Sequence, residues 1–214
     1  MMCLHDAKAL TQFPPHLPLT AANLVTVLNA SPSKCEQMYI VPKVLEIFAE
    51  TEDGRRALLS FDDVTFGGAA LSDALGDRLV ALGVKLASFV GSTGESSYLR
   101  ALLTPESGPL FSSDRDFATD KNWQWLRCEG AIARYTELLP QGDGTVEVIV
   151  KAGWPGRSAS NRKDGAWCTN DLYQVHPNHP TWLKYMGRLD DTLTLSLGEK
   201  TNPVPIELTL VSNM

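Results

Sequence analysis

Residues 63–95, DVTFGGAALSDALGDRLVALGVKLASFVGSTGE, carry the clearest structural pattern in the chain. Residues 63–66 and the apolar run 84–90 have the composition of β-strands. Between them, Ser72 is placed to cap a helix, and Gly83 is placed to end it. The apolar side chains of this helix follow the spacing i, i+4 and i+7, at Leu75, Leu79 and Leu82. The stretch therefore predicts a strand, a helix and a second strand.

Strand, helix and strand at this length predict a βαβ crossover, in which the two strands are parallel. A glycine-rich turn follows each strand: Gly67-Gly68-Ala69-Ala70 after the first and Gly91-Ser92-Thr93-Gly94 after the second. Open α/β sheets bind ligands at the carboxyl ends of their strands, so both turns are candidate binding elements. Two loops that only need positive φ would have the same composition. Neither turn has the GxxxxGKS/T or GxGxxG spacing of two familiar phosphate loops.

On the amino-terminal side of this unit the sequence predicts short helices and one strand. Thr20 is placed to cap a helix that runs to about Leu28. Residues 38–41 form a short apolar run, and Pro42 suits the first turn of a helix over 43–50. A turn at Asp53-Gly54 precedes a further short helical segment.

On the carboxyl-terminal side the pattern changes to strands. Residues 104–120 are rich in Pro, Gly, Ser and Asp, which predicts a long loop or a boundary. After it come segments with strand composition: 123–126, 131–139, 145–150, 182–185 and 192–197. The predicted fold class is α/β, with a parallel βαβ layer followed by a β-rich layer.

The overall composition narrows the possible functions. The chain has 214 residues and a formal net charge of −6, which argues against binding to nucleic acid or to an anionic membrane surface. No stretch approaches the ~20 apolar residues of a membrane span, and the first residues do not have the pattern of a signal peptide. The four cysteines have no paired spacing, so we expect them to be reduced and the protein to be cytoplasmic.

Four polar residues in the second half are open to two interpretations. Asp171 could accept the hydroxyls of a ribose, although an Asp after an Asn is more often a turn residue. His176 and His179 could suggest a metal site, but the intervening proline favours a plain polar loop. Arg188 could belong to a surface turn that satisfies its own charges with Asp190 and Asp191.

Three longer stretches taken together resemble a known family. They are FGGAALSDALGDRLVALGVKLASFVGSTGES, GAWCTNDLYQVHP and LKYMGRLDDTLTLSLGEKTNPVPIE. In this order they resemble the signatures of the adenylate-forming (AMP-binding) superfamily: a Gly-Gly-Ala turn, a Tyr-Gly-x-Thr-Glu turn, a Thr-Gly-Asp segment and Gly-Arg-x-Asp. The resemblance is greatest to the adenylation units of fungal NRPS-like and carboxylate-reductase-type enzymes. It covers about residues 18–207 and identifies the chain as a fragment of the large adenylation subdomain.

The resemblance implies a role for particular residues. It implies nucleotide contacts for Gly67, Gly68, Ala69, Gly91, Ser92, Thr93, Asp171 and Arg188, with Asp171 and Arg188 at the ribose. It implies catalytic roles for Thr93, Glu95 and Asp190, of which Glu95 would bind the metal and Asp190 would be a hinge. It implies an acyl-substrate pocket at Tyr39, Val41 and Ala69.

The resemblance also implies the reaction and the domain organisation. A carboxylic acid would attack the α-phosphate of ATP, with Mg²⁺, and the product acyl-AMP could pass to the pantetheine thiol of a carrier domain. The implied domains are residues 1–118 (α/β part), 119–189 (β-rich part) and 190–214 (hinge and start of a C-terminal lid).

The family's lysine-bearing phosphate loop and catalytic C-terminal subdomain do not occur in these 214 residues. We therefore expect the chain alone to be inactive or weak. The alternative is a non-catalytic remnant that binds only a nucleotide or a protein partner. A third interpretation, an unrelated α/β protein, would place Asp171 and Arg188 far from the glycine turns.

Overall fold

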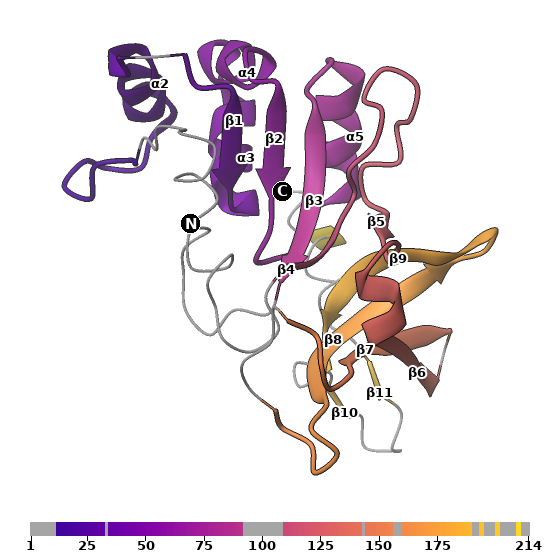
Figure 1. Cartoon of the computed structure of the whole chain (residues 1–214). Coiled ribbons are helices and arrows are strands. Elements are labelled where there is room, and N and C mark those ends of the chain that lie inside the picture. Colours follow the sequence, from indigo (N-terminus) through magenta and orange to yellow (C-terminus); the bar gives the residue numbers. More distant parts are fainter. Residues whose placement is uncertain are drawn as a thin grey trace.

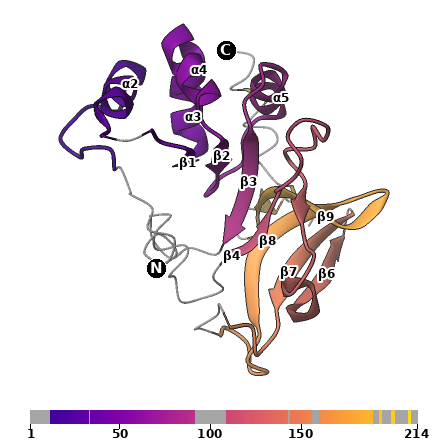
Figure 2. The same ribbon diagram turned by 45° about the horizontal axis from the view of Figure 1, so that its top comes forward.

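A nine-stranded sheet runs through the part of the chain that the structure describes (Figure 1). The structure is a computed structural model, and it describes residues 12–32, 34–91, 109–142, 144–155, 160–189, 193–194, 200–201 and 209–210. The strand order is β1-β2-β3-β4-β5-β9-β8-β7-β6. The α-helices gather at the β1–β3 end, as Figures 1 and 2 both show.

The first half of the sheet is parallel, as the βαβ pattern predicts. Strands β1 (Gln37–Ile40), β2 (Asp63–Phe66) and β3 (Leu86–Gly91) pair side by side in the same direction. Their carboxyl ends therefore meet at one edge. The glycine turn that follows β2 lies at that edge, beside the end of β3.

Most helices of this half begin where the sequence predicts. The helices are α2 (Ala21–Ala30), α3 (Pro42–Glu50), α4 (Glu52–Leu59) and α5 (Asp73–Ala81). The amide of Asn23 donates to the Thr20 hydroxyl, and the amide of Leu75 donates to the Ser72 hydroxyl, so both predicted caps are confirmed. The predicted turn at Asp53-Gly54 is wrong, because Thr51 caps α4 and both residues lie inside its first turn.

The end of α5 differs from the sequence pattern by one residue. Leu82 follows the helix as its C-cap and is 47% exposed, so it does not continue the buried stripe of Leu75 and Leu79. Gly83 has φ +97, a conformation that glycine adopts at no steric cost, and it ends the helix as predicted.

Strand β3 is where the sheet changes direction. On its other side it pairs antiparallel with β4 (Pro109–Ser112). The prediction of a loop over 104–120 is therefore wrong at 109–112, where four residues form a strand inside the sheet, paired on both sides. Strand β5 (Leu126–Arg127) continues the sheet and pairs with β9.

The rest of the sheet is an antiparallel meander of longer strands. It consists of β6 (Thr136–Gly142), β7 (Thr145–Val150), β8 (Trp167–His176) and β9 (His179–Arg188). The strand predicted over 145–150 is confirmed, and the one predicted over 182–185 is part of β9. Residues 131–139 instead begin with a 3-10 turn (Ile132–Tyr135), and 123–126 overlaps β5 only at its last residue. Strand β10 (Leu193–Thr194) is part of the predicted alternating strand, and it pairs with β11 (Lys200–Thr201), which lies beyond that prediction.

Two hydrophobic clusters support the two halves of the sheet. The first surrounds Leu45, Phe48 and Leu79, and the second surrounds Leu126, Val148 and Tyr173. Trp123 follows the predicted boundary at residue 118, yet it packs in the first cluster. Likewise, residues 110–111 pack in the second.

Candidate functional site

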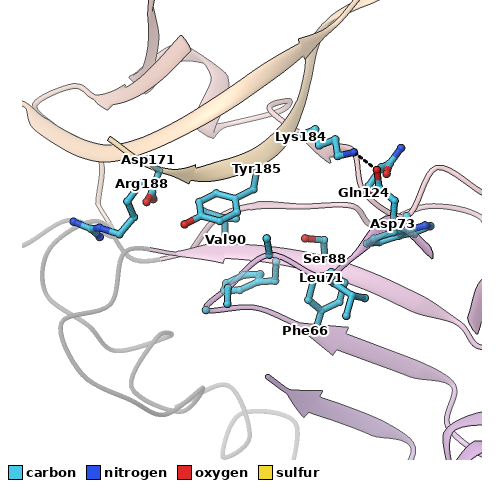
Figure 3. A pocket seen from close by; sticks show the side chains of 15 residues that line it. Phe66, Leu71, Asp73, Ser88, Val90, Gln124, Asp171, Lys184, Tyr185 and Arg188 are labelled. Carbon is cyan, nitrogen blue, oxygen red and sulfur yellow. Dashed lines mark hydrogen bonds and ion pairs between the residues drawn. The ribbon is translucent and has the colours of Figure 1, made fainter. Parts of the chain in front are cut away.

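A cavity of about 120 Å³ lies where the two halves of the sheet meet (Figure 3). The turn after β2, the end of β3 and the start of α5 form one side, and strands β8 and β9 form the other. The cavity thus lies at the carboxyl ends of the parallel strands, where open α/β sheets bind their ligands.

The glycine turn brings bare backbone to this cavity. The amide of Gly67 donates to the carbonyl of Ile40 at 3.2 Å, and a Cβ at Gly67 would lie 2.7 Å from the carbonyl oxygen of Phe89. A side chain at Gly67 would therefore push β2 and β3 apart. Gly68 has φ +87, and both Gly68 and Ala69 line the cavity. Because glycine has no side chain, a ligand could contact the main chain of this turn directly.

Asp171 and Arg188 face the turn from the other half of the sheet. They are register partners on β8 and β9, and both line the cavity. The structure thus brings the Asp171–Arg188 pair and the Gly68–Ala69 turn together at one cavity, although about a hundred residues separate them in sequence. This arrangement contradicts the third interpretation, an unrelated protein with scattered motifs.

A buried carboxylate holds the backbone next to Asp171. Glu147 on β7 is 4% exposed, and its carboxylate accepts the Asn170 amide at 3.1 Å. Asn170 has φ 57, the left-handed region, and its carbonyl accepts the amide of Leu189 at 2.6 Å. These bonds join β7, β8 and the end of β9, so they fix the strand segments that carry Asp171 and Arg188.

Two tyrosines complete this side of the cavity. Tyr173 is fully buried, and its hydroxyl lies 3.5 Å from Asp171 Oδ2. Burial, and then the nearby Asp171 and Tyr185, raise the pKa of Tyr173 well above its usual value. Tyr173 therefore stays protonated and donates toward Asp171. Tyr185 lines the cavity, and its ring packs edge-on against Tyr173 at 5.8 Å.

The far end of the cavity is polar. Lys184 Nζ on β9 lies 2.6 Å from Asp73 Oδ2 at the start of α5, and this ion pair joins the two halves of the sheet (Figure 3). Gln124 lies beside the pair. Trp123 also lines the cavity, and its Nε1 donates to Asp77 at 2.9 Å. None of these side chains was predicted from the sequence. The position of Lys184 and Tyr185 a few residues before Arg188 in the same strand is the one signal that could have suggested any of them.

Several curated proteins similar to this chain are fungal. The chain is 31% identical over 204 residues to an adenylate-forming reductase of Heterobasidion annosum, a match that covers 92% of this chain and 17% of the relative. It is 29% identical over 180 residues to a carboxylic acid reductase of Neurospora crassa, covering 82% of this chain and 16% of the relative. The chain is a relative of the adenylate-forming enzymes. No protein-family model matches its sequence. The chain spans about a sixth of the length of these relatives.

Solved adenylate-forming structures share the fold. The o-succinylbenzoate CoA synthetase of Bacillus subtilis, in complex with its acyl-adenylate intermediate, superposes with a TM-score of 0.61 at 18% identity, over 90% of this chain and 38% of that one. An amide bond synthetase of Marinactinospora thermotolerans gives a TM-score of 0.60 at 17% identity, over 90% and 39%. The predicted α/β fold, as part of a larger adenylate-forming fold, is confirmed.

Other residues that the adenylate-forming resemblance singles out lie elsewhere. Tyr39 and Val41, the expected acyl-pocket residues, are 37% and 51% exposed and do not line this cavity. Gly91 ends β3, and its backbone pairs with Pro109. The remaining predicted positions, Ser92, Thr93, Glu95 and Asp190, lie outside the described residues.

The two histidines of the β8–β9 turn pack as a ring cluster. The ring of His179 stacks on Trp182 at 4.1 Å, and His176 Nδ1 accepts the amide of Asn178 at 3.1 Å. Burial first, and then the positive charges of His179 and Arg127, lower the pKa of His176. These contacts favour the plain-loop interpretation. Within the described ranges, no group of three His, Cys, Asp or Glu side chains could hold a metal ion, and no helix is long and apolar enough to cross a membrane.

Proposed function

We propose that this chain is part of an ATP-dependent enzyme that activates a carboxylic acid as acyl-AMP, and that the cavity binds the AMP portion. The observation that carries the proposal is the placement of Asp171 and Arg188 across one cavity from the Gly68–Ala69 turn. The sequence similarity to adenylate-forming reductases supports it.

The chemistry of the lining suits a nucleoside. The Asp171 carboxylate would accept hydrogen bonds from ribose hydroxyls, and the Arg188 guanidinium would donate to the same sugar. Between the Asp171–Arg188 pair and the polar end of the cavity at Lys184 and Asp73, Tyr185 and Val90 offer apolar surface to a flat base (Figure 3). The Gly68 backbone leaves room for the base to approach on the opposite side.

The remaining parts of the proposed reaction use residues outside the described ranges. The acid carboxylate would attack the α-phosphate of ATP and release pyrophosphate, with Thr93 and Glu95 near the phosphate and Asp190 as a hinge. Mg²⁺ would neutralise developing charge on the phosphates. We expect the acid as substrate and a carrier-domain pantetheine thiol as the acceptor of the acyl group.

Ligand binding to the purified chain tests the cavity directly. A non-hydrolysable acyl sulfamoyl adenosine at ~100 times its Kd should stabilise the fold by about 2.7 kcal/mol, which raises Tm by roughly 5–11 °C for a domain of this size. Asp171→Ala should abolish this shift. Glu137→Ala, an exposed carboxylate on the edge strand β6, should leave it unchanged. A folded wild-type protein with no shift would refute the proposed site.

A second assay separates activation from binding. Acid-dependent exchange of pyrophosphate into ATP reports the activation step itself. Exchange above background would show that this chain activates acids unaided. A ligand-dependent Tm shift without exchange would support the alternative of a nucleotide-binding chain that is not itself a catalyst.

A further inference from the structure

One acceptor inside the cavity has no hydrogen-bond donor. The Oε1 atom of Gln124 is buried from solvent, and no donor in the described part of the chain reaches it. Leaving a buried acceptor unpaired is costly, so buried polar atoms nearly always have a partner. Because the Gln124 side chain lines the cavity, rotation of its amide would turn Oε1 toward a donor on a bound ligand.

The neighbours of Gln124 set the direction from which this donor must come. Trp123 turns its N–H away to Asp77, and the Lys184–Asp73 ion pair closes the same end of the cavity. Figure 3 shows Gln124 at this end and Asp171 with Arg188 at the other, with Tyr185 and Val90 between them. A ligand whose sugar contacts Asp171 therefore extends its base toward the amide of Gln124.

From this placement we infer that Gln124 determines base specificity by pairing with the amine edge of adenine. The inference rests on the proposed function, because it assumes a nucleoside with its ribose at Asp171. A glutamine amide presents one acceptor and two donors, and adenine offers an N–H donor beside a ring-nitrogen acceptor. Hypoxanthine and guanine carry a carbonyl oxygen in place of that amine. On the base edge that also carries N7, both O6 and N7 are then acceptors, so Gln124 Oε1 would face an acceptor and remain unpaired.

The comparison of AMP with IMP on the wild-type chain is the first test. The two nucleotides differ at the base edge that Gln124 would read. We expect isothermal titration to give AMP a Kd about 5–150-fold lower than that of IMP, the range that one well-formed bidentate base contact provides. AMP and IMP binding with equal affinity would overturn the inference and leave the proposed function standing. A folded chain that binds neither nucleotide would overturn both.

A substitution tests whether the Gln124 side chain causes the preference for AMP over IMP. Gln124→Leu should bring the two affinities within about twofold of each other, mainly by weakening AMP. Gln174→Leu, an exposed glutamine on β8, is the matched control and should preserve the wild-type ratio. If Gln124→Leu does not fold, Gln124→Glu retains an acceptor but loses the donor, and it should lower the ratio while AMP remains preferred. Retention of the full wild-type ratio in the folded Gln124 variant would overturn the inference.

Discussion

Replacement of Gly76 by alanine should destabilise this protein, although the same change usually stabilises a helix. Gly76 lies inside α5, where alanine is favoured over glycine by ~1 kcal/mol. A Cβ at this position, however, would lie 2.1 Å from Cζ2 of Trp123 and 2.4 Å from Cε2. Ordinary carbon contacts are about 3.5–4.0 Å, so the indole must move by more than 1 Å.

The cost of that movement can be worked from the contacts of Trp123. The ring is 3% exposed, packs against Phe66 at 5.8 Å and donates to Asp77. Overpacking a core costs ~1–3 kcal/mol, and the lost hydrogen bond adds about 1 kcal/mol. After the helix-propensity gain, we expect Gly76→Ala to lower the stability by ~1–3 kcal/mol and Tm by about 2–12 °C in thermal melts.

A double-mutant cycle identifies the cause. In a Trp123→Leu background the smaller side chain leaves room for the new methyl group. There Gly76→Ala should be neutral or stabilise the fold by up to ~1 kcal/mol. An equal loss in both backgrounds, or a rise in Tm on the wild-type background, would refute the role of the Trp123 contact.

Further changes test other parts of the fold. Glu147→Leu should cost about 2–4 kcal/mol in urea unfolding, because it leaves the Asn170 amide without its acceptor, whereas Glu147→Gln keeps an acceptor and should cost less. Burial first, and then nearby positive groups, lower the pKa of His176 below the unfolded value of about 6.5, so the stability should fall as the pH drops through 6.5 toward the lowered pKa. A His176→Gln variant should show a shallower fall between pH 7.5 and 5.5. Ser72→Ala should cost about 1 kcal/mol of thermal stability, since it removes the acceptor of the Leu75 amide; a loss below ~0.3 kcal/mol would mean that the cap contributes little.

Local chemistry predicts the first half of the fold well. Caps and stops act within a few residues, so the start of α2 at Thr20 and the limits of α5 could be predicted from the sequence alone. The second half depends on distant pairing. Strand β8 was missed because Asn170 and Asp171 have the composition of a turn. The structure places a left-handed residue inside a strand there and stabilises it by Glu147, which is 23 residues away in sequence.

The residues that line the cavity also include some that could be predicted from the sequence and some that could not. The motif residues Gly68, Ala69, Asp171 and Arg188 could be selected from the sequence through their resemblance to a family, and the structure brings them to one place. Their assigned roles remain predictions. The polar end could not be foreseen, since Lys184 and its partner lie 111 residues apart and no motif marks either.

The strand β5 is only two residues long, so the sheet is weakly joined where its two halves meet. The meander β6–β9 forms through successive neighbours, whereas β5 reaches β9 only after a loop of more than fifty residues has closed, at Leu126–Leu183 and Arg127–Trp182. We therefore expect amide hydrogen exchange to report two cooperative units that separate at this seam before either unfolds. A molecule in the cavity touches both units, so it would raise the protection of β2 and β8 together. A bound ligand would therefore hold the two units together.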